Sequence, residues 1–155
     1  MTEFSAAEKT LASYFKKYLP SVHAAGTHLE LLNDDILVMS APLTDNHTEQ
    51  GVAYGGSLYQ LAMTACWSAL YLKCVEQLPK PNILTRDGQI RYRHPCSENP
   101  LKATCKLPNA RQWDGFFAHF EKTGKTSLTL TSTIMNGNEV SAYFDGVFVL
   151  LDEEH

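Results

Sequence analysis

One short segment of the chain brings together residue types that can stabilise and move charge. Asn46 and His47 lie in a polar loop, and Gly55 and Gly56 open the apolar run that follows. The first amides of a helix have no intrahelical acceptor, the helix dipole adds positive potential there, and glycine lets a ligand approach the backbone. Gly55 and Gly56 are therefore candidate donors to a developing oxyanion, with the Asn46 amide as a further donor. His47 is the best candidate base nearby, because histidine is the side chain that titrates closest to neutral pH.

Each of these residues also has a plainer interpretation. The two glycines can serve only a tight turn into a closely packed helix, and His47 can be an exposed loop residue. Ser57 stands where a hydroxyl commonly caps a helix, and no partner base is evident that would make it a nucleophile. The residues alone leave these alternatives open.

A long buried helix must position the glycines. The run Leu58 to Val75 contains one charged residue, Lys73. A helix that is apolar nearly all round is buried, so the pattern predicts a central helix over 56–78, closed by Pro79 and Pro81.

The remaining segments predict an amphipathic helix and about six strands. The first helix spans 4–19, capped by Ser5 with Glu8 three residues on and stopped by Pro20. A polar loop over 42–54 and a helix over 113–122 are also expected, the latter with strand as its alternative. The predicted strands lie at 27–32, 36–41, 82–94 (two pieces broken near Asp87-Gly88), 101–107, 127–134 and 140–151, with a type I′ turn at Asn136-Gly137. A sheet wrapped around the central helix satisfies this pattern.

Composition narrows the class of protein. The chain has 155 residues, of which 44% are hydrophobic, and this predicts one domain over 1–155. The net charge of -4 argues against nucleic-acid binding.

We expect no membrane span, because the longest apolar run is short and contains Gln60, Thr64 and Ser68. The acidic N-terminus predicts no signal peptide, and four cysteines without CxxC spacing predict reduced thiols, no metal site and a cytoplasmic location.

Two motifs resemble a known superfamily. The run from Asn46 through Gly51, Gly55-Gly56-Ser57 and on to Ala62 resembles the opening of the hotdog helix in small acyl-CoA thioesterases. The stretch 90–95 resembles the strand that follows that helix. More closely, Gly51-x-Ala53-Tyr54-Gly55-Gly56-Ser57-Leu58-Tyr59, with Ala65-x-Trp67 later, is similar to the thioesterase-type C-terminal domain of YiiD proteins. The resemblance spans nearly the whole chain, and the chain is too short for the acetyltransferase domain that often precedes this one.

The resemblance implies an α+β hotdog fold, in which an antiparallel sheet wraps a long central helix, with an extra N-terminal helix. It implies an enzyme that processes acyl-CoA or acyl-carrier-protein thioesters in fatty acid metabolism. Coenzyme A or phosphopantetheine would be part of the substrate, so no separate cofactor is expected. It also implies a homodimer or a dimer of dimers with shared pockets.

The chain departs from the superfamily pattern at two positions. Many hotdog thioesterases carry an Asp or Glu where this helix has Met63, and the turn histidine is Tyr54 here. Neither replacement is a good general base. Thioester hydrolysis therefore competes with decarboxylation of malonyl-acyl carrier protein, which needs no base, and with a non-catalytic acyl-thioester binding module.

Substrate binding is predicted for two groups of residues. Near the helix start these are Tyr54, Ser57 and Met63. Arg91 and Arg93 alternate along one strand and so share a face that could hold phosphates, or simply face solvent. Arg86 could pair with Asp87, reach the pocket of a neighbouring subunit, or simply lie in a solvated turn.

Overall fold

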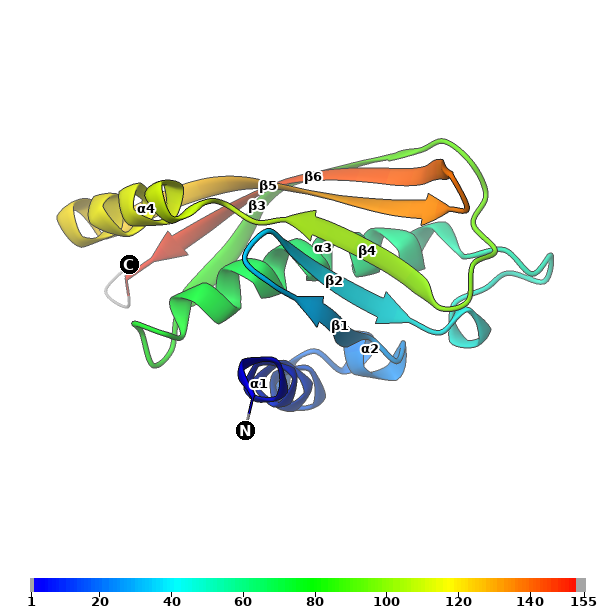
Figure 1. Ribbon diagram of the computed structural model, residues 1–155, viewed down its shortest axis with the longest axis horizontal. Helices are drawn as coiled ribbons and strands as arrows, with labels where there is room; N and C mark the ends of the chain where they lie inside the picture. The colour runs from blue at the N-terminus through cyan, green and yellow to red at the C-terminus, as the bar shows by residue number, and fades with distance from the viewer. Residues whose placement is uncertain (1, 153–155) are drawn as a thin grey trace.

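Six antiparallel strands form one curved sheet around a long helix (Figure 1). The computed structural model describes residues 2–152. The strands run in the spatial order β1-β2-β4-β5-β6-β3, so that β1 and β3 are the two edges. Their bounds are β1 His28–Leu32, β2 Ile36–Ala41, β3 Asn82–Tyr92, β4 Leu101–Lys106, β5 Lys125–Asn136 and β6 Glu139–Leu151. The predicted wrapping of a sheet around one central helix is confirmed.

The central helix, α3 (Gly55–Cys74), is buried along most of its length. Small residues on the face toward the sheet allow close packing, and the Ser132 hydroxyl of β5 donates to the Ala62 carbonyl at 2.8 Å. The helix ends at Cys74, four residues before the predicted end at Leu78. Leu78 precedes Pro79, and proline disfavours helical backbone angles at the residue before it.

The N-terminal helix, α1 (Glu3–Tyr18), packs beside the edge strand β1 and also contacts α3. Thr2, not the predicted Ser5, caps it: the Thr2 hydroxyl accepts the Ser5 amide at 3.1 Å, because the helix starts earlier than expected. Tyr14 packs on Trp67 and Tyr71 of α3, with ring centroids 4.9 and 4.8 Å apart. Pro20 ends α1 but also opens a short helix, α2 (Pro20–Ala24), since proline is well suited to a first helical turn.

The edge strand β3 is continuous, although the sequence predicted two pieces. The pairing with β6 shifts by one residue between Thr85 and Asp87, so that Arg86 is the extra residue of a bulge. The bulge preserves the strand on both sides of the apparent break. The helix α4 (Ala110–Thr123) confirms the helical interpretation of 113–122 and extends it, because Asn109 and Gln112 form a capping box.

The β5–β6 hairpin turns at Gly137 and Asn138, so the predicted type I′ turn at Asn136-Gly137 is wrong. Gly137 has φ +62°, but no non-glycine residue within 2–152 has a positive φ, and type I′ requires two. Asn136 stays in the strand because its side-chain oxygen accepts the Ser97 amide at 3.0 Å. Figure 1 places this hairpin tip at the same end of the sheet as the start of α3.

The four cysteines are unpaired and buried. Burial raises the pKa of Cys74 from 9.0 to about 12, and burial followed by the neighbouring Cys105 raises that of Cys66 well above its usual range. No helix within residues 2–152 has the length and apolar character needed to cross a membrane.

We expect the native thiols to be inert toward a disulfide reagent at pH 8, because all four are buried away from the reagent. For Cys66 and Cys74 the raised pKa also suppresses the thiolate, which is the reactive form. All four should react once urea unfolds the chain. The pKa of Cys74 is about 12 in the folded chain and 9.0 in the unfolded chain, so the unfolded chain loses this proton first as the pH rises. The free energy of unfolding should therefore fall as the pH rises from about 9 toward 12. Rapid reaction of any native thiol would contradict the expectation.

Candidate active site at the start of the central helix

The start of α3 presents two amides without an acceptor. The amides of Ser57 and Leu58 both donate to the Tyr54 carbonyl, at 3.0 and 3.1 Å. Among the described residues, no acceptor takes the N–H of Gly55 or Gly56, and Tyr54 supplies no side-chain cap. Both amides are therefore available to an external oxygen atom, in the positive potential of the helix start.

Tyrosine rings surround these amides. The Tyr54 ring lies over Gly56: a Cβ on that glycine would be 2.5 Å from Tyr54 Cε2. From the edge strand β3, the Tyr92 hydroxyl donates to the Gly55 carbonyl at 2.8 Å. Partial removal from water, then the nearby Tyr59 and Tyr54, raise the pKa of Tyr92, so its phenol remains a donor at neutral pH. The entrance is therefore aromatic and uncharged.

A wall of the site runs along α3 and onto the sheet. The Tyr59 ring packs edge-on against Phe144, with centroids 5.5 Å apart, and its hydroxyl fills the space above Gly88. Met63 follows one turn later and is partly buried against the core. Sequence reasoning missed Tyr59, Tyr92 and Gly88 as site residues. The four-residue spacing of Tyr59 and Met63, and a glycine inside a strand, were the available signals.

Asn46 does not act as the predicted oxyanion donor in this geometry. Its side chain is buried, and its amide nitrogen donates to the carbonyls of Ala25 and Pro42 at 3.0 and 2.8 Å. Both amide hydrogens are thereby used. Asn46 instead holds the loop that leads into α3, and its own carbonyl accepts the Tyr54 amide at 2.8 Å.

Replacing Asn46 by alanine should therefore reduce stability first. Loss of two partly buried hydrogen bonds leaves the carbonyls of Ala25 and Pro42 without this donor, and we expect the free energy of unfolding to fall by about 2 kcal/mol. Urea denaturation followed by circular dichroism measures this change. Unaltered stability would contradict the structural role, and any loss of activity in the variant must be compared at matched folded fraction.

His47 takes the plainer role that the sequence left open, whereas Ser57 takes neither of the roles considered for it, cap or nucleophile. His47 is exposed, and its Nδ1 lies 2.7 Å from the Thr48 carbonyl in its own loop. Ser57 is partly buried in the first turn of α3, but its side chain neither caps the helix nor meets a base among the described residues. Neither geometry forms an activated nucleophile.

The three predicted arginines do not meet the glycines within one chain. Arg86 lies on the bulge of β3, not in a turn, and pairs with Asp87 at 3.7 Å, one of its predicted roles. Tyr92 reaches α3, so the alternation of the strand directs Arg91 to the opposite face. Arg93 shares that parity and is exposed, with its amide bonded to the Ser141 carbonyl at 2.8 Å.

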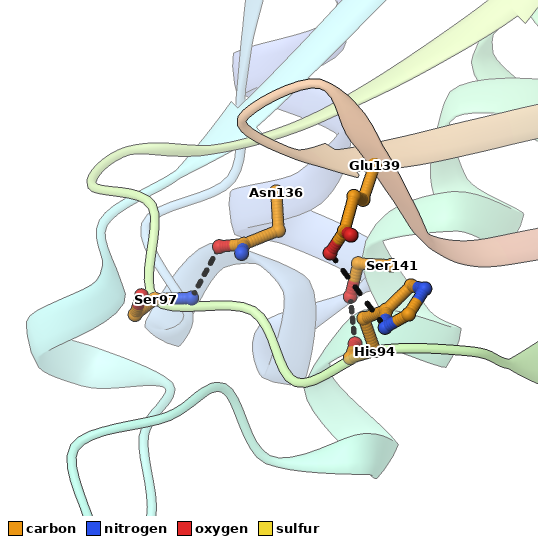
Figure 2. A network of polar contacts seen from close by, with 5 residues as sticks. All are labelled: His94, Ser97, Asn136, Glu139 and Ser141. Carbon is orange, nitrogen blue, oxygen red and sulfur yellow. Dashed lines mark hydrogen bonds and ion pairs between the residues drawn. The ribbon is translucent and has the colours of Figure 1, made fainter.

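A serine, a histidine and a glutamate also meet near the hairpin tip, but they do not form a catalytic triad (Figure 2). The buried Ser141 hydroxyl donates to the backbone carbonyl of His94 at 2.7 Å, not to its ring. The His94 ring instead lies 3.7 Å from Glu139. With the bonds from Ser97 to Asn136 and from Gly137 to Glu98, this network fastens the β3–β4 connection to the hairpin.

A groove of about 1440 Å³ lies between the C-terminal part of α3, the β1–β2 turn and the first turns of α1 and α4. Its lining includes Leu72, Leu128 and Trp113, with Lys73 and Lys106 beside them. It contains none of the residues around Gly55 and Gly56, so the aromatic entrance and this groove are separate features.

The fold and chain match known proteins over nearly their full length. A structure of a protein of unknown function from Chlorobaculum tepidum is 30% identical, with TM-score 0.90 and 97% of each chain covered. A putative thioesterase from Shewanella oneidensis is 19% identical, with TM-score 0.83 over 96% of this chain and 99% of its own. A thioesterase from Haemophilus influenzae is 13% identical, with TM-score 0.67 over 96% and 94%.

These neighbours confirm the predicted hotdog fold. The family described as "Putative thioesterase (yiiD_Cterm)" matches residues 8–152. The match covers both the glycine-rich start of α3 and the sheet that encloses the helix, and it agrees with the predicted resemblance. The chain belongs to this family of thioesterase-type proteins.

Proposed function

We propose that the chain hydrolyses acyl thioesters of coenzyme A or acyl carrier protein, with the carbonyl bound at the start of α3. The observation that carries this proposal is the pair of unpaired amides at Gly55 and Gly56 in a member of a thioesterase-type family. Water adds to the thioester carbon, the carbonyl oxygen becomes an oxyanion, and the amides stabilise that charge. The proton that the attacking water loses passes through solvent to the leaving sulfur. Collapse then breaks the carbon–sulfur bond and releases a thiol and a carboxylic acid.

A second reaction is favoured by the residues that stand where a base would be. Met63 and Tyr54 occupy these positions, and neither activates water well near neutral pH. Decarboxylation of a malonyl thioester breaks a carbon–carbon bond, releases carbon dioxide and leaves an enolate on the thioester oxygen. The same two amides would stabilise that enolate, and solvent would then protonate its carbon.

We further propose that the active form is a homodimer, or a dimer of such dimers. The edge strand β3 pairs only with β6 among the described strands, which leaves one side of an 11-residue strand open. Exposed main-chain groups on a long edge favour pairing with another strand. Tyr59, Met63 and Trp67 form a partly exposed apolar stripe beside this edge, which a second copy would cover.

The phosphates of coenzyme A or phosphopantetheine are proposed to contact Arg91 and Arg93. Both side chains are exposed at the end of β3 that carries Tyr92. Guanidinium groups bind phosphate through paired hydrogen bonds. Coenzyme A or phosphopantetheine is part of the substrate in this proposal, so the reaction needs no separate cofactor. A role in fatty acid metabolism fits such substrates. A cytoplasmic location fits the four unpaired thiols, because thiols stay reduced there.

One product analysis tests these proposals. Purified protein is incubated with acyl-CoA, acyl-carrier-protein and malonyl-carrier-protein panels, and free thiol and acyl product are followed together. Thiol release supports hydrolysis, whereas an acetyl thioester without thiol supports decarboxylation. No turnover with any thioester, together with ligand-dependent stabilisation in a melt, would replace both reactions by a binding module.

A further inference from the structure

The Tyr92 hydroxyl touches the peptide group that the proposed reaction uses. It donates to the Gly55 carbonyl at 2.8 Å, across a sequence separation of 37 residues. The ring also lies 3.6 to 3.7 Å from where a Cβ on Gly55 would stand. This ring comes from the edge strand and is 54% exposed, so the contact is not enforced by burial in the core.

The carbonyl of Gly55 and the N–H of Gly56 belong to one conjugated peptide unit. Resonance gives the carbon–nitrogen bond partial double-bond character, so charge drawn toward the oxygen is withdrawn from the nitrogen. A hydrogen bond to the carbonyl therefore strengthens the donor at the other end of the unit. The Gly56 N–H, which has no acceptor among the described residues, is that donor.

We propose that Tyr92 is a positioning residue that polarises and orients the Gly55-Gly56 peptide for oxyanion binding. The inference rests on the proposed function, because it assigns the Gly56 amide to the thioester oxygen. Tyr92 itself does not touch the substrate carbonyl. Tyr59 and Tyr54 are the titratable groups that act on its hydroxyl. Tyr92 thus links the edge strand to the chemistry at the helix start.

The test is Tyr92→Phe, which keeps the ring and removes the hydroxyl. Tyr18→Phe is the matched control, because Tyr18 is similarly exposed at 56% but lies on α1. We expect kcat to fall by about 3- to 10-fold with KM unchanged, since one polarising bond is worth less than a whole oxyanion donor. The Gly56 amide nitrogen should also shift in a nitrogen–proton NMR spectrum of the uncomplexed variant, while Tyr18→Phe leaves both kcat and that resonance in place.

The outcomes separate this inference from the function beneath it. Unchanged kcat in Tyr92→Phe overturns the positioning role while wild-type turnover keeps the function. A raised KM at constant kcat also overturns it, because Tyr92 would then bind substrate directly. An unmoved Gly56 resonance refutes the polarisation even in a variant of altered activity. If the wild-type protein turns over no thioester, the proposed function is wrong, and the positioning role of Tyr92 fails with it.

Discussion

Gly56→Ala is expected to fold as stably as the wild type and to lose about 100-fold in kcat/KM, the scale of removing one oxyanion donor. The added Cβ would lie 2.5 Å from Tyr54 Cε2, and the Tyr54 side chain is 60% exposed. The ring can therefore swing outward at little cost, and alanine favours a helix over glycine by up to about 1 kcal/mol. The added methyl group beside the amide would then hinder the approach of the proposed thioester carbonyl.

Gly115→Ala is the control for this change. Gly115 lies within α4, and a Cβ there would meet no atom within 4 Å. We expect it to raise the free energy of unfolding by about 0.5–1 kcal/mol and to leave turnover unchanged. Steady-state kinetics and urea denaturation of both variants provide the comparison. Full kcat/KM in Gly56→Ala, on a substrate that the wild type uses, would show that this amide does not bind the oxyanion.

Elements set by local pattern could be predicted from the sequence. The run over 58–75 has too few polar residues for an exposed helix, and the alternation over 127–134 assigns Leu128, Leu130 and Ile134 to one face. The structure places all three against the core. At Arg86 the same reasoning failed, because a single extra residue breaks the period of two without ending the strand.

The site was harder to predict because its contacts join distant segments. The side-chain amide of Asn46 donates to the carbonyls of Ala25 and Pro42, so it cannot also donate to a substrate oxygen. Only the folded chain shows these two bonds. Tyr92 meets Gly55 because β3 is the edge strand beside the start of α3. A motif locates residue types along the chain, whereas the availability of each donor depends on which carbonyls the fold brings within reach.

Two glycines on neighbouring strands determine the shape of the site wall. Gly88 of β3 and Gly146 of β6 pair directly and leave a hollow on the inner face of the sheet. The Tyr59 hydroxyl occupies the hollow above Gly88, while the rings of Phe144 and Phe148 close over Gly146. The same substitution at each glycine therefore meets different neighbours, which makes the two variants a matched pair.

Gly146→Ala should lower the free energy of unfolding by about 3 kcal/mol, at the upper end of the usual cost of overpacking a core. Its Cβ would lie 2.7 Å from both Phe144 Cε1 and Phe148 Cε2, and neither ring is exposed, so no side chain can move toward solvent. Gly88→Ala should cost no more than about 1 kcal/mol, because its main neighbour is the movable hydroxyl end of the half-buried Tyr59. Urea denaturation at one fixed protein concentration measures both changes, since self-association would otherwise shift the apparent stability. A smaller loss for Gly146→Ala than for Gly88→Ala would show that the phenylalanine layer yields more easily than its burial indicates.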